Sequence, residues 1–100
     1  MPRRAQWTQR PFSEEVPRLL AECGLSQRQL AAMAEVHQSH LSRLLRGSKH
    51  KTPSRDLAAR VARAFGLPEE YFAEYREAVV LEHIRSDAAL RDRLFRRLTR

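Results

Sequence analysis

Apolar residues recur along this chain at intervals of three and four, the spacing that places them on one face of an α-helix. The sequence has only three glycines, and its Val, Ile and Thr residues do not alternate with polar ones as they would in a half-buried strand. We therefore predict an all-α chain. The six predicted helices cover about 13–23, 26–34, 38–46, 52–66, 68–85 and 87–98.

Capping residues mark the expected ends of the first three helices. Ser13 is the expected N-cap of the first helix, and Gly24 is its expected end because glycine readily adopts the left-handed conformation. Ser26, followed three residues later by Gln29, has the pattern of a capping box. Gly47 is expected to end the third helix.

The later boundaries depend on proline and hydroxyl residues. Thr52 is expected to cap the fourth helix, with Pro53 at its first position, where a missing N–H costs least. Pro68 is expected to open the fifth helix, and Ser86 is expected to cap the last.

The second and third predicted helices are separated by only about three residues, which is too few for an antiparallel hairpin and suits a sharp crossing. The small side chain of Ala31 would let the two helices approach closely. Their shared core is expected to consist of five apolar residues: Leu30, Ala34, Val36, Leu41 and Leu44.

The remaining surface of the third helix carries no acidic residue, and every side chain on it can donate a hydrogen bond to a base edge or a phosphate. Its members are His37, Gln38, Ser39, Ser42, Arg43 and Arg46. A helix fits the major groove of DNA, and its first turn reaches deepest when the helix enters end-on. This pattern predicts a DNA recognition helix.

These segments resemble the helix-turn-helix of the phage-repressor (Cro/cI, XRE-type) family. The likeness lies in residues 25–31 (LSQRQLA), Val36 and residues 41–47 (LSRLLRG), and residues 53–67 resemble that family's fourth helix. It covers roughly residues 12–75, and the combined spacing is more specific than any single piece. The resemblance implies a lambda-repressor-like, five-helix DNA-binding domain, to which this chain adds a C-terminal helix.

The resemblance also implies roles for individual residues. Gln38 and Ser39 would read bases, Gln27 would touch phosphate and brace Gln38, and Arg46 would hold phosphate. From side-chain chemistry, glutamine suits adenine and arginine suits guanine, which adds Arg43 to the base-reading set. The expected base contacts are Gln38, Ser39, Arg43 and His37. The expected phosphate contacts are Gln27, Ser42, Arg46, Lys49 and Lys51.

Each of these assignments has a plainer alternative. Gln38 and Arg43 could be ordinary solvated side chains, and Lys49, His50 and Lys51 could form a solvated loop without DNA contacts.

Two positions depart from the family's usual residues. Glu35 stands in the turn where the family usually has glycine, so either Glu35 adopts a left-handed backbone or the turn differs. His37 stands at the N-cap of the third helix, where Ser or Thr is common and caps better.

Charge is distributed unevenly along the chain. The 19 Lys and Arg residues outnumber 12 Asp and Glu residues, which gives a formal net charge of +7. Residues 1–11 hold three arginines and no acid, and residues 26–51 hold five basic residues against one acid. Residues 67–85 reverse the balance, with five glutamates against two arginines. This asymmetry favours a polyanion-binding face opposite a different kind of surface.

Residues 1–11 form a basic N-terminal arm that allows three interpretations. Arg3 and Arg4 would enter the minor groove, as the arms of some DNA-binding domains do. Alternatively, Trp7 pins the arm to the protein or to a partner, or the arm is disordered.

The C-terminal third of the chain exceeds what a helix-turn-helix requires. Tyr71, Phe72, Tyr75 and Val79 are expected to complete the core. Further apolar residues at helical spacing favour a homodimer over a larger core. These residues are Val80, Leu81, Ile84, Leu90, Leu94 and Leu98. The expected organisation is the arm 1–11, a DNA-binding domain 12–80 with its helix-turn-helix at 26–47, and a dimerising extension 81–100.

Metal binding, catalysis and membrane insertion find little support. His37 and His40 share a helical face, but Cys23 and His50 stand at no fixed ligand spacing from them. Cys23 is expected to be a small core residue. No glycine-rich elbow or clustered carboxylate pair supports a catalytic site, so we expect no metal, no cofactor and no enzymatic activity. Without a secretory signal or an apolar run of roughly 18 residues, a cytoplasmic protein is expected.

The leading interpretation is therefore a dimeric, sequence-specific transcriptional regulator that represses at a palindromic site in double-stranded DNA. The first alternative is the antitoxin of a toxin–antitoxin module, which would present its acidic fifth helix or its leucine stripe to the toxin; an anti-repressor is another possible partner. The second is a protein-interaction adapter on the same fold. Acidic residues on the third helix would indicate an adapter, and that helix has none.

Overall fold

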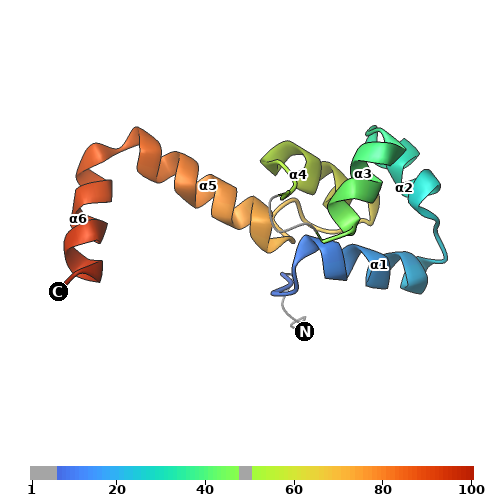
Figure 1. Cartoon of the computed structure of the whole chain (residues 1–100), viewed down its shortest axis with the longest axis horizontal. Helices are drawn as coiled ribbons and strands as arrows, with labels where there is room; N and C mark the ends of the chain where they lie inside the picture. Colours follow the sequence, from blue (N-terminus) through green and yellow to red (C-terminus); the bar gives the residue numbers. More distant parts are fainter. Residues whose placement is uncertain (1–6, 48–50) are drawn as a thin grey trace.

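A computed structural model describes residues 7–47 and 51–100 (Figure 1). The described residues form helices joined by short loops and contain no strand, which confirms the all-α prediction. The helices are α1 (Phe12–Cys23), α2 (Gln27–Ala34), α3 (Gln38–Leu45), α4 (Arg55–Ala64), α5 (Ala73–Ser86) and α6 (Ala88–Leu98).

The hydrophobic core lies among α1 to α4 and is closed by the segment that leads into α5. Leu30 and Leu41 are fully buried where α2 and α3 meet, as predicted. Phe72 is fully buried too, and its ring centroid lies 4.9 Å from that of Phe12. The expected core residues Leu44, Ala34 and Tyr71 are also buried, whereas Val36 and Tyr75 are partly buried against the cluster.

Two predicted helix ends are confirmed. Ser26 and Gln29 form a complete capping box: the Gln29 amide N–H donates to the Ser26 hydroxyl, and the Ser26 N–H donates to the Gln29 side-chain oxygen. Gly24 ends α1 with a φ of 66°, and its N–H donates to carbonyls of the last helical turn.

The predicted N-cap of α1, Ser13, is wrong. Ser13 lies inside the helix and Pro11 occupies the N-cap, without a side-chain hydrogen bond. The first free N–H of the helix, that of Phe12, donates instead to the Glu74 carboxylate at 2.9 Å, across 62 residues of sequence. A carboxylate at this position also interacts favourably with the positive end of the helix dipole. Glu74 therefore caps α1 from the first turn of α5.

The N-caps of two later helices also differ from prediction. Ser54, not Thr52, caps α4 by accepting the Leu57 N–H, and Pro53 is buried ahead of the helix. Asp87, not Ser86, caps α6 by accepting the Leu90 N–H.

Pro68 opens a turn and not the fifth helix. The Tyr71 N–H donates to the Pro68 carbonyl, and α5 begins only at Ala73. The reason is that Tyr71 and Phe72 are drawn into the core, which an uninterrupted helix from Pro68 would not allow.

Cys23 is exposed and is not a core residue. It lies in the last turn of α1, directly before Gly24, while Val16, Leu19 and Leu20 carry the buried face. The helical period that suggested burial for Cys23 continues past the end of the packed surface.

The two C-terminal helices project from this core (Figure 1). No residue of α5 or α6 is buried, whereas each of α1 to α4 contributes buried residues. Figure 1 shows α6 beyond the far end of α5 and turned sharply against it, well away from α1 to α4. The apolar side chains of these two helices therefore remain largely uncovered within one chain.

Candidate nucleic-acid interface

Helices α2 and α3 are joined by a tight turn at Glu35. Glu35 has φ 59° and ψ 47°, the left-handed conformation, and is the sole described residue other than glycine with a positive φ. Its N–H donates to the Ala32 carbonyl, and the Val36 N–H donates to the Ala31 carbonyl at 2.9 Å. Ala31 is 3% exposed, which fits its predicted role of letting the helices pack closely. Of the two possibilities for Glu35, the structure shows the left-handed one.

Arg60 from α4 holds this turn in place. One of its terminal nitrogens donates to the Glu35 carbonyl at 2.9 Å and to the Ala34 carbonyl at 3.2 Å. Asp56, one turn earlier on α4, orients the Arg60 guanidinium through two further hydrogen bonds. The i, i+4 spacing of Asp56 and Arg60 is visible in the sequence, but their reach to the turn is not.

Replacing Glu35 with glycine is expected to raise the free energy of unfolding by about 0.5–1 kcal/mol, because glycine adopts a positive φ without strain. Denaturant unfolding measures this change. Ala32→Gly in α2 is the matched control, and it should destabilise by about 1 kcal/mol because that residue has ordinary helical geometry. A Glu35→Gly variant less stable than wild type would contradict a left-handed turn.

The outward face of α3 is polar and basic. Leu41 and Leu44 point into the core, and the described part of α3 has no acidic side chain. The structure leaves all four expected base-contact residues exposed: His37, Gln38, Ser39 and Arg43.

The first turn of α3 begins without a side-chain cap. His37 stands at the N-cap with extended backbone and forms no side-chain capping bond, as its poor capping chemistry predicts. No hydrogen bond joins Gln27 to Gln38 within the described residues, so the bracing of Gln38 stays a prediction.

The expected phosphate contacts flank the recognition face. Arg46 and Lys51 are exposed, and Gln27 and Ser42 are partly buried. Lys49, like His50, lies outside the described residues. All of the described members come from α2, α3 or the segment before α4.

The N-terminal segment is bound to the start of α5. The Thr8 N–H donates to the Tyr71 carbonyl at 3.0 Å, and Arg76 donates to the Thr8 carbonyl at 2.9 Å. The Arg76 guanidinium also lies 4.7 Å from the centroid of the Trp7 ring, a cation–π contact. Of the three interpretations of the arm, contact of Trp7 with the protein itself is the one observed; Arg3 and Arg4 lie outside the described residues.

A buried carboxylate fixes α1 against the segment before α5. Glu15 is 1% exposed and accepts hydrogen bonds from Arg18 and from the Tyr71 hydroxyl. The hydrogen bond from Arg18 lowers the pKa of Glu15 below its ordinary value, outweighing the opposite effect of burial. Burial, together with the bond to Glu15, raises the pKa of Tyr71.

The position of Glu15 in the sequence could have predicted its burial, although a glutamate is usually assigned to the surface. Glu15 stands three residues after Phe12 and four before Leu19, on the apolar face of α1. A charged residue on such a face is expected to have a partner.

Within residues 7–47 and 51–100, no group of three or more His, Cys, Asp or Glu side chains is arranged to hold a metal ion. None of the described helices is long and apolar enough to cross a membrane.

Comparison with models of known protein families gives a match. A family model described as Helix-turn-helix matches residues 18–72, more than half of the chain, from the middle of α1 to the residue before α5. Searches of curated proteins and of solved structures each found no match. The matched segment includes the capping box, the left-handed turn and the polar face of α3. The chain therefore belongs to the Cro/cI-like, XRE-type helix-turn-helix family of DNA-binding transcription regulators.

Proposed function

We propose that this regulator is a sequence-specific repressor that binds a palindromic operator as a homodimer. The observation that carries the proposal is the face of α3, where exposed hydrogen-bond donors stand without any acidic side chain. An acidic residue there would repel the phosphates that flank the major groove. The absence of one in α3 supports DNA contact over a role as a protein-interaction adapter.

Base recognition would come from the first two turns of α3. The Gln38 side-chain amide can form two hydrogen bonds with adenine, and the Arg43 guanidinium can form two with guanine. Each such contact is worth about 1–3 kcal/mol of discrimination. Ser39 and His37 would contact neighbouring base edges from the end of the helix that enters the groove.

Phosphate contacts would set the orientation of α3. Arg46 follows the last turn of the helix, and Lys51 precedes α4, so both flank the recognition face. Gln27 and Ser42 would add neutral contacts from α2 and α3, and Lys49 would contact the same backbone. Such contacts position the protein and carry no base preference.

A two-fold dimer would place one α3 in each of two successive major grooves, about 34 Å apart. The uncovered apolar residues of α5 and α6 support this arrangement because they lie away from α3 (Figure 1). Repression requires only that a bound dimer occupy the site, so it needs no surface beyond those described.

The proposal predicts a strong salt dependence. If Arg46, Lys49 and Lys51 each neutralise one phosphate per subunit, the logarithm of the association constant should fall with a slope of about −5 against the logarithm of salt concentration. Lys51→Ala should make this slope shallower by about 2 in the dimer. Arg85→Ala, an exposed arginine on α5, should leave it unchanged. A wild-type slope near zero would contradict the predicted contacts.

Selection from a random duplex pool at fixed salt tests specificity. The expected result is an enriched site with two-fold symmetry and half-sites about one helical turn apart. A pool without any enriched sequence would exclude sequence-specific binding. An enriched site without symmetry would exclude the palindromic operator but not recognition by α3.

A further inference from the structure

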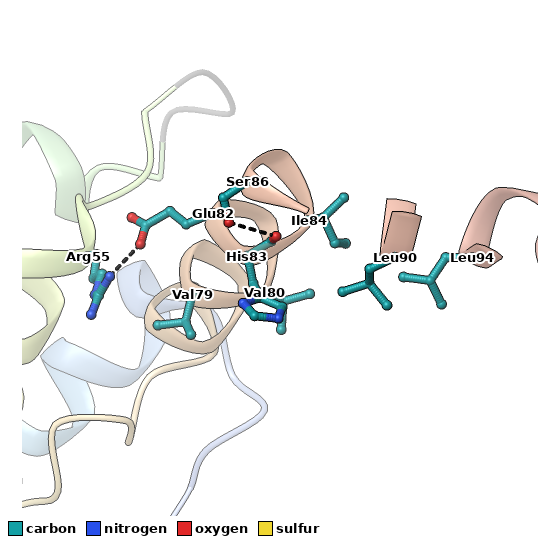
Figure 2. Close-up of a pocket in the computed structure, with 9 residues that line it drawn as sticks. All are labelled: Arg55, Val79, Val80, Glu82, His83, Ile84, Ser86, Leu90 and Leu94. Carbon is teal, nitrogen blue, oxygen red and sulfur yellow. Dashed lines mark hydrogen bonds and ion pairs between the residues drawn. The ribbon is translucent and has the colours of Figure 1, made fainter. Parts of the chain in front are cut away.

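An apolar groove of about 530 Å³ lies in the angle between α5 and α6 (Figure 2). Val79, Val80 and Ile84 line it from α5, and Leu90 and Leu94 line it from α6. Figure 2 shows Ile84, Leu90 and Leu94 gathered in this angle, with the Arg55–Glu82 ion pair at the rim nearest α4.

The groove and α6 are both left uncovered. Val80 is 55% exposed and Leu98, which continues the row of Leu90 and Leu94, is 83% exposed. Among the described helices, α5 alone makes an extended contact with α6. An isolated helix of 11 residues is marginal in water, so α6 needs a packing partner.

The charged residues beside the leucine row of α6 indicate an acidic partner surface, and a second copy of this chain can supply one. Helix α6 carries four arginines against one aspartate, and Arg93 and Arg97 border the leucine row at i+3 from Leu90 and Leu94. Neither arginine forms an ion pair within the described residues. The α6 surface is thus apolar along one row and basic beside it.

Helix α5 presents the complementary pattern. Glu77 is exposed, stands three residues before Val80 and four before Leu81, and forms no ion pair with another described residue. Its apolar stripe is therefore bordered by an unpaired acid, as that of α6 is bordered by unpaired bases.

We infer that α6 of a second copy packs into the groove and against Glu77, while α6 of the first copy packs into the groove of the second. Helices α5 and α6 of the two copies then form one four-helix bundle. This reciprocal arrangement covers the groove and the leucine row in both copies at once, and its two-fold symmetry closes the assembly at a dimer. The inference rests on the proposed homodimer and specifies how it is built.

Sedimentation velocity with Leu94→Asp tests whether α6 forms the seam. Wild type should be dimeric at micromolar concentration, and Leu94→Asp should raise the dimer dissociation constant by about 100-fold or more, because it buries a charge in an apolar contact. Ala88→Asp is the matched control, since it adds the same charge to an exposed position of α6 that is neither three nor four residues from the leucine row or from Arg93 and Arg97; it should remain dimeric. A monomeric wild type, or a dimeric Leu94→Asp, would overturn the inference.

Charge reversal tests which helix α6 meets. Glu77→Arg should weaken the dimer by about 10-fold, and adding Arg93→Glu and Arg97→Glu in the same chain should restore it. If α5 instead met α5, the added changes on α6 would not restore the dimer, and the reciprocal arrangement would be wrong. Circular dichroism at each step confirms that helicity is retained.

The DNA selection separates this inference from the proposed function. Leu94→Asp should select the same half-site as wild type but bind it only at higher protein concentration. A wild-type dimer that shows the expected response to charge reversal yet selects no sequence would retain the bundle and exclude the specific repressor.

Discussion

Replacing Glu15 with alanine is expected to lower the free energy of unfolding by about 2–3 kcal/mol, because it removes the acceptor at the centre of a buried hydrogen-bond network. The Tyr71 hydroxyl, which is bonded to Glu15 inside the protein, would lose its partner, and Arg18 would keep only Glu22. The Arg18 side chain is 38% exposed, so water offsets part of the loss. For a domain of this size the melting temperature should fall by about 10–20 °C.

The same residue gives the stability a defined dependence on acid. Because the pKa of Glu15 is lower in the folded chain than its ordinary value of 4.5, the unfolded chain binds this proton more readily. The stabilisation is therefore present above the ordinary carboxyl range and is lost as the pH falls below it. Urea unfolding from pH 7 to pH 3 should show a smaller loss for Glu15→Ala than for wild type.

Glu14 provides the matched control. It is the neighbouring acid in the first turn of α1, but it is exposed. Glu14→Ala should cost only about 0.3–0.5 kcal/mol through the helix dipole. Equal losses for the two variants would show that burial of Glu15 contributes nothing.

Replacing Arg43 with alanine is expected to lower affinity for the selected operator by about 10- to 100-fold for each half-site, the value of one lost two-bond contact with guanine. A repeat of the selection with this variant should show that preference at one base pair of the half-site has relaxed while the other positions keep theirs. Electrophoretic mobility shifts on the wild-type site and on single-base variants measure both effects.

Variants of two other basic residues serve as controls that distinguish a base contact by Arg43 from a phosphate contact. Lys51→Ala should weaken binding to operator and to unrelated DNA alike, since a phosphate contact carries no base preference. Arg85→Ala removes an exposed arginine from α5 and should change neither. If Arg43→Ala behaved like Lys51→Ala, Arg43 would contact phosphate and not a base.

The sequence correctly predicted features that depend on residues close together in the chain. The Ser26–Gln29 capping box, the Gly24 helix end and the burial of Leu30 and Leu41 each depend on residues a few positions apart, and the structure confirms them. For Glu35 the sequence left two possibilities, a left-handed backbone or a different turn, and the structure shows the left-handed backbone.

The failures at Ser13 and Pro68, and the missed role of Arg60, share one physical cause, which is contact over long sequence distances. Ser13 has good capping chemistry, yet Glu74 satisfies the start of α1 from 62 residues away. Arg60 supports the turn from another helix, and no spacing in the sequence joins it to Glu35. Pro68 does not start a helix because Tyr71 and Phe72, which follow it, are buried in the core, and α5 begins only after them.

For the candidate DNA-binding site, the sequence predicts which side chains are exposed but not which base each one contacts. The exposure of Gln38 and Arg43 follows from helical periodicity, because Leu41 and Leu44 fix which side of α3 is buried. Which base each one reads depends on how α3 lies in the groove. That geometry is a property of the complex with DNA and requires the selection described above.

The cap that Glu74 places on α1 has a consequence for where the folding unit ends. The family match stops at residue 72, but both Glu74, which completes α1, and Arg76, which holds Thr8, lie in the first turn of α5. A fragment cut at the end of the match would leave α1 without its Glu74 cap and would lose the Arg76 hydrogen bond to Thr8. We therefore expect the smallest cooperative unit to extend through Arg76. Its closing contact is non-local, since Phe12 and Glu74 are 62 residues apart, and it carries the loop-closure cost of a long chain segment.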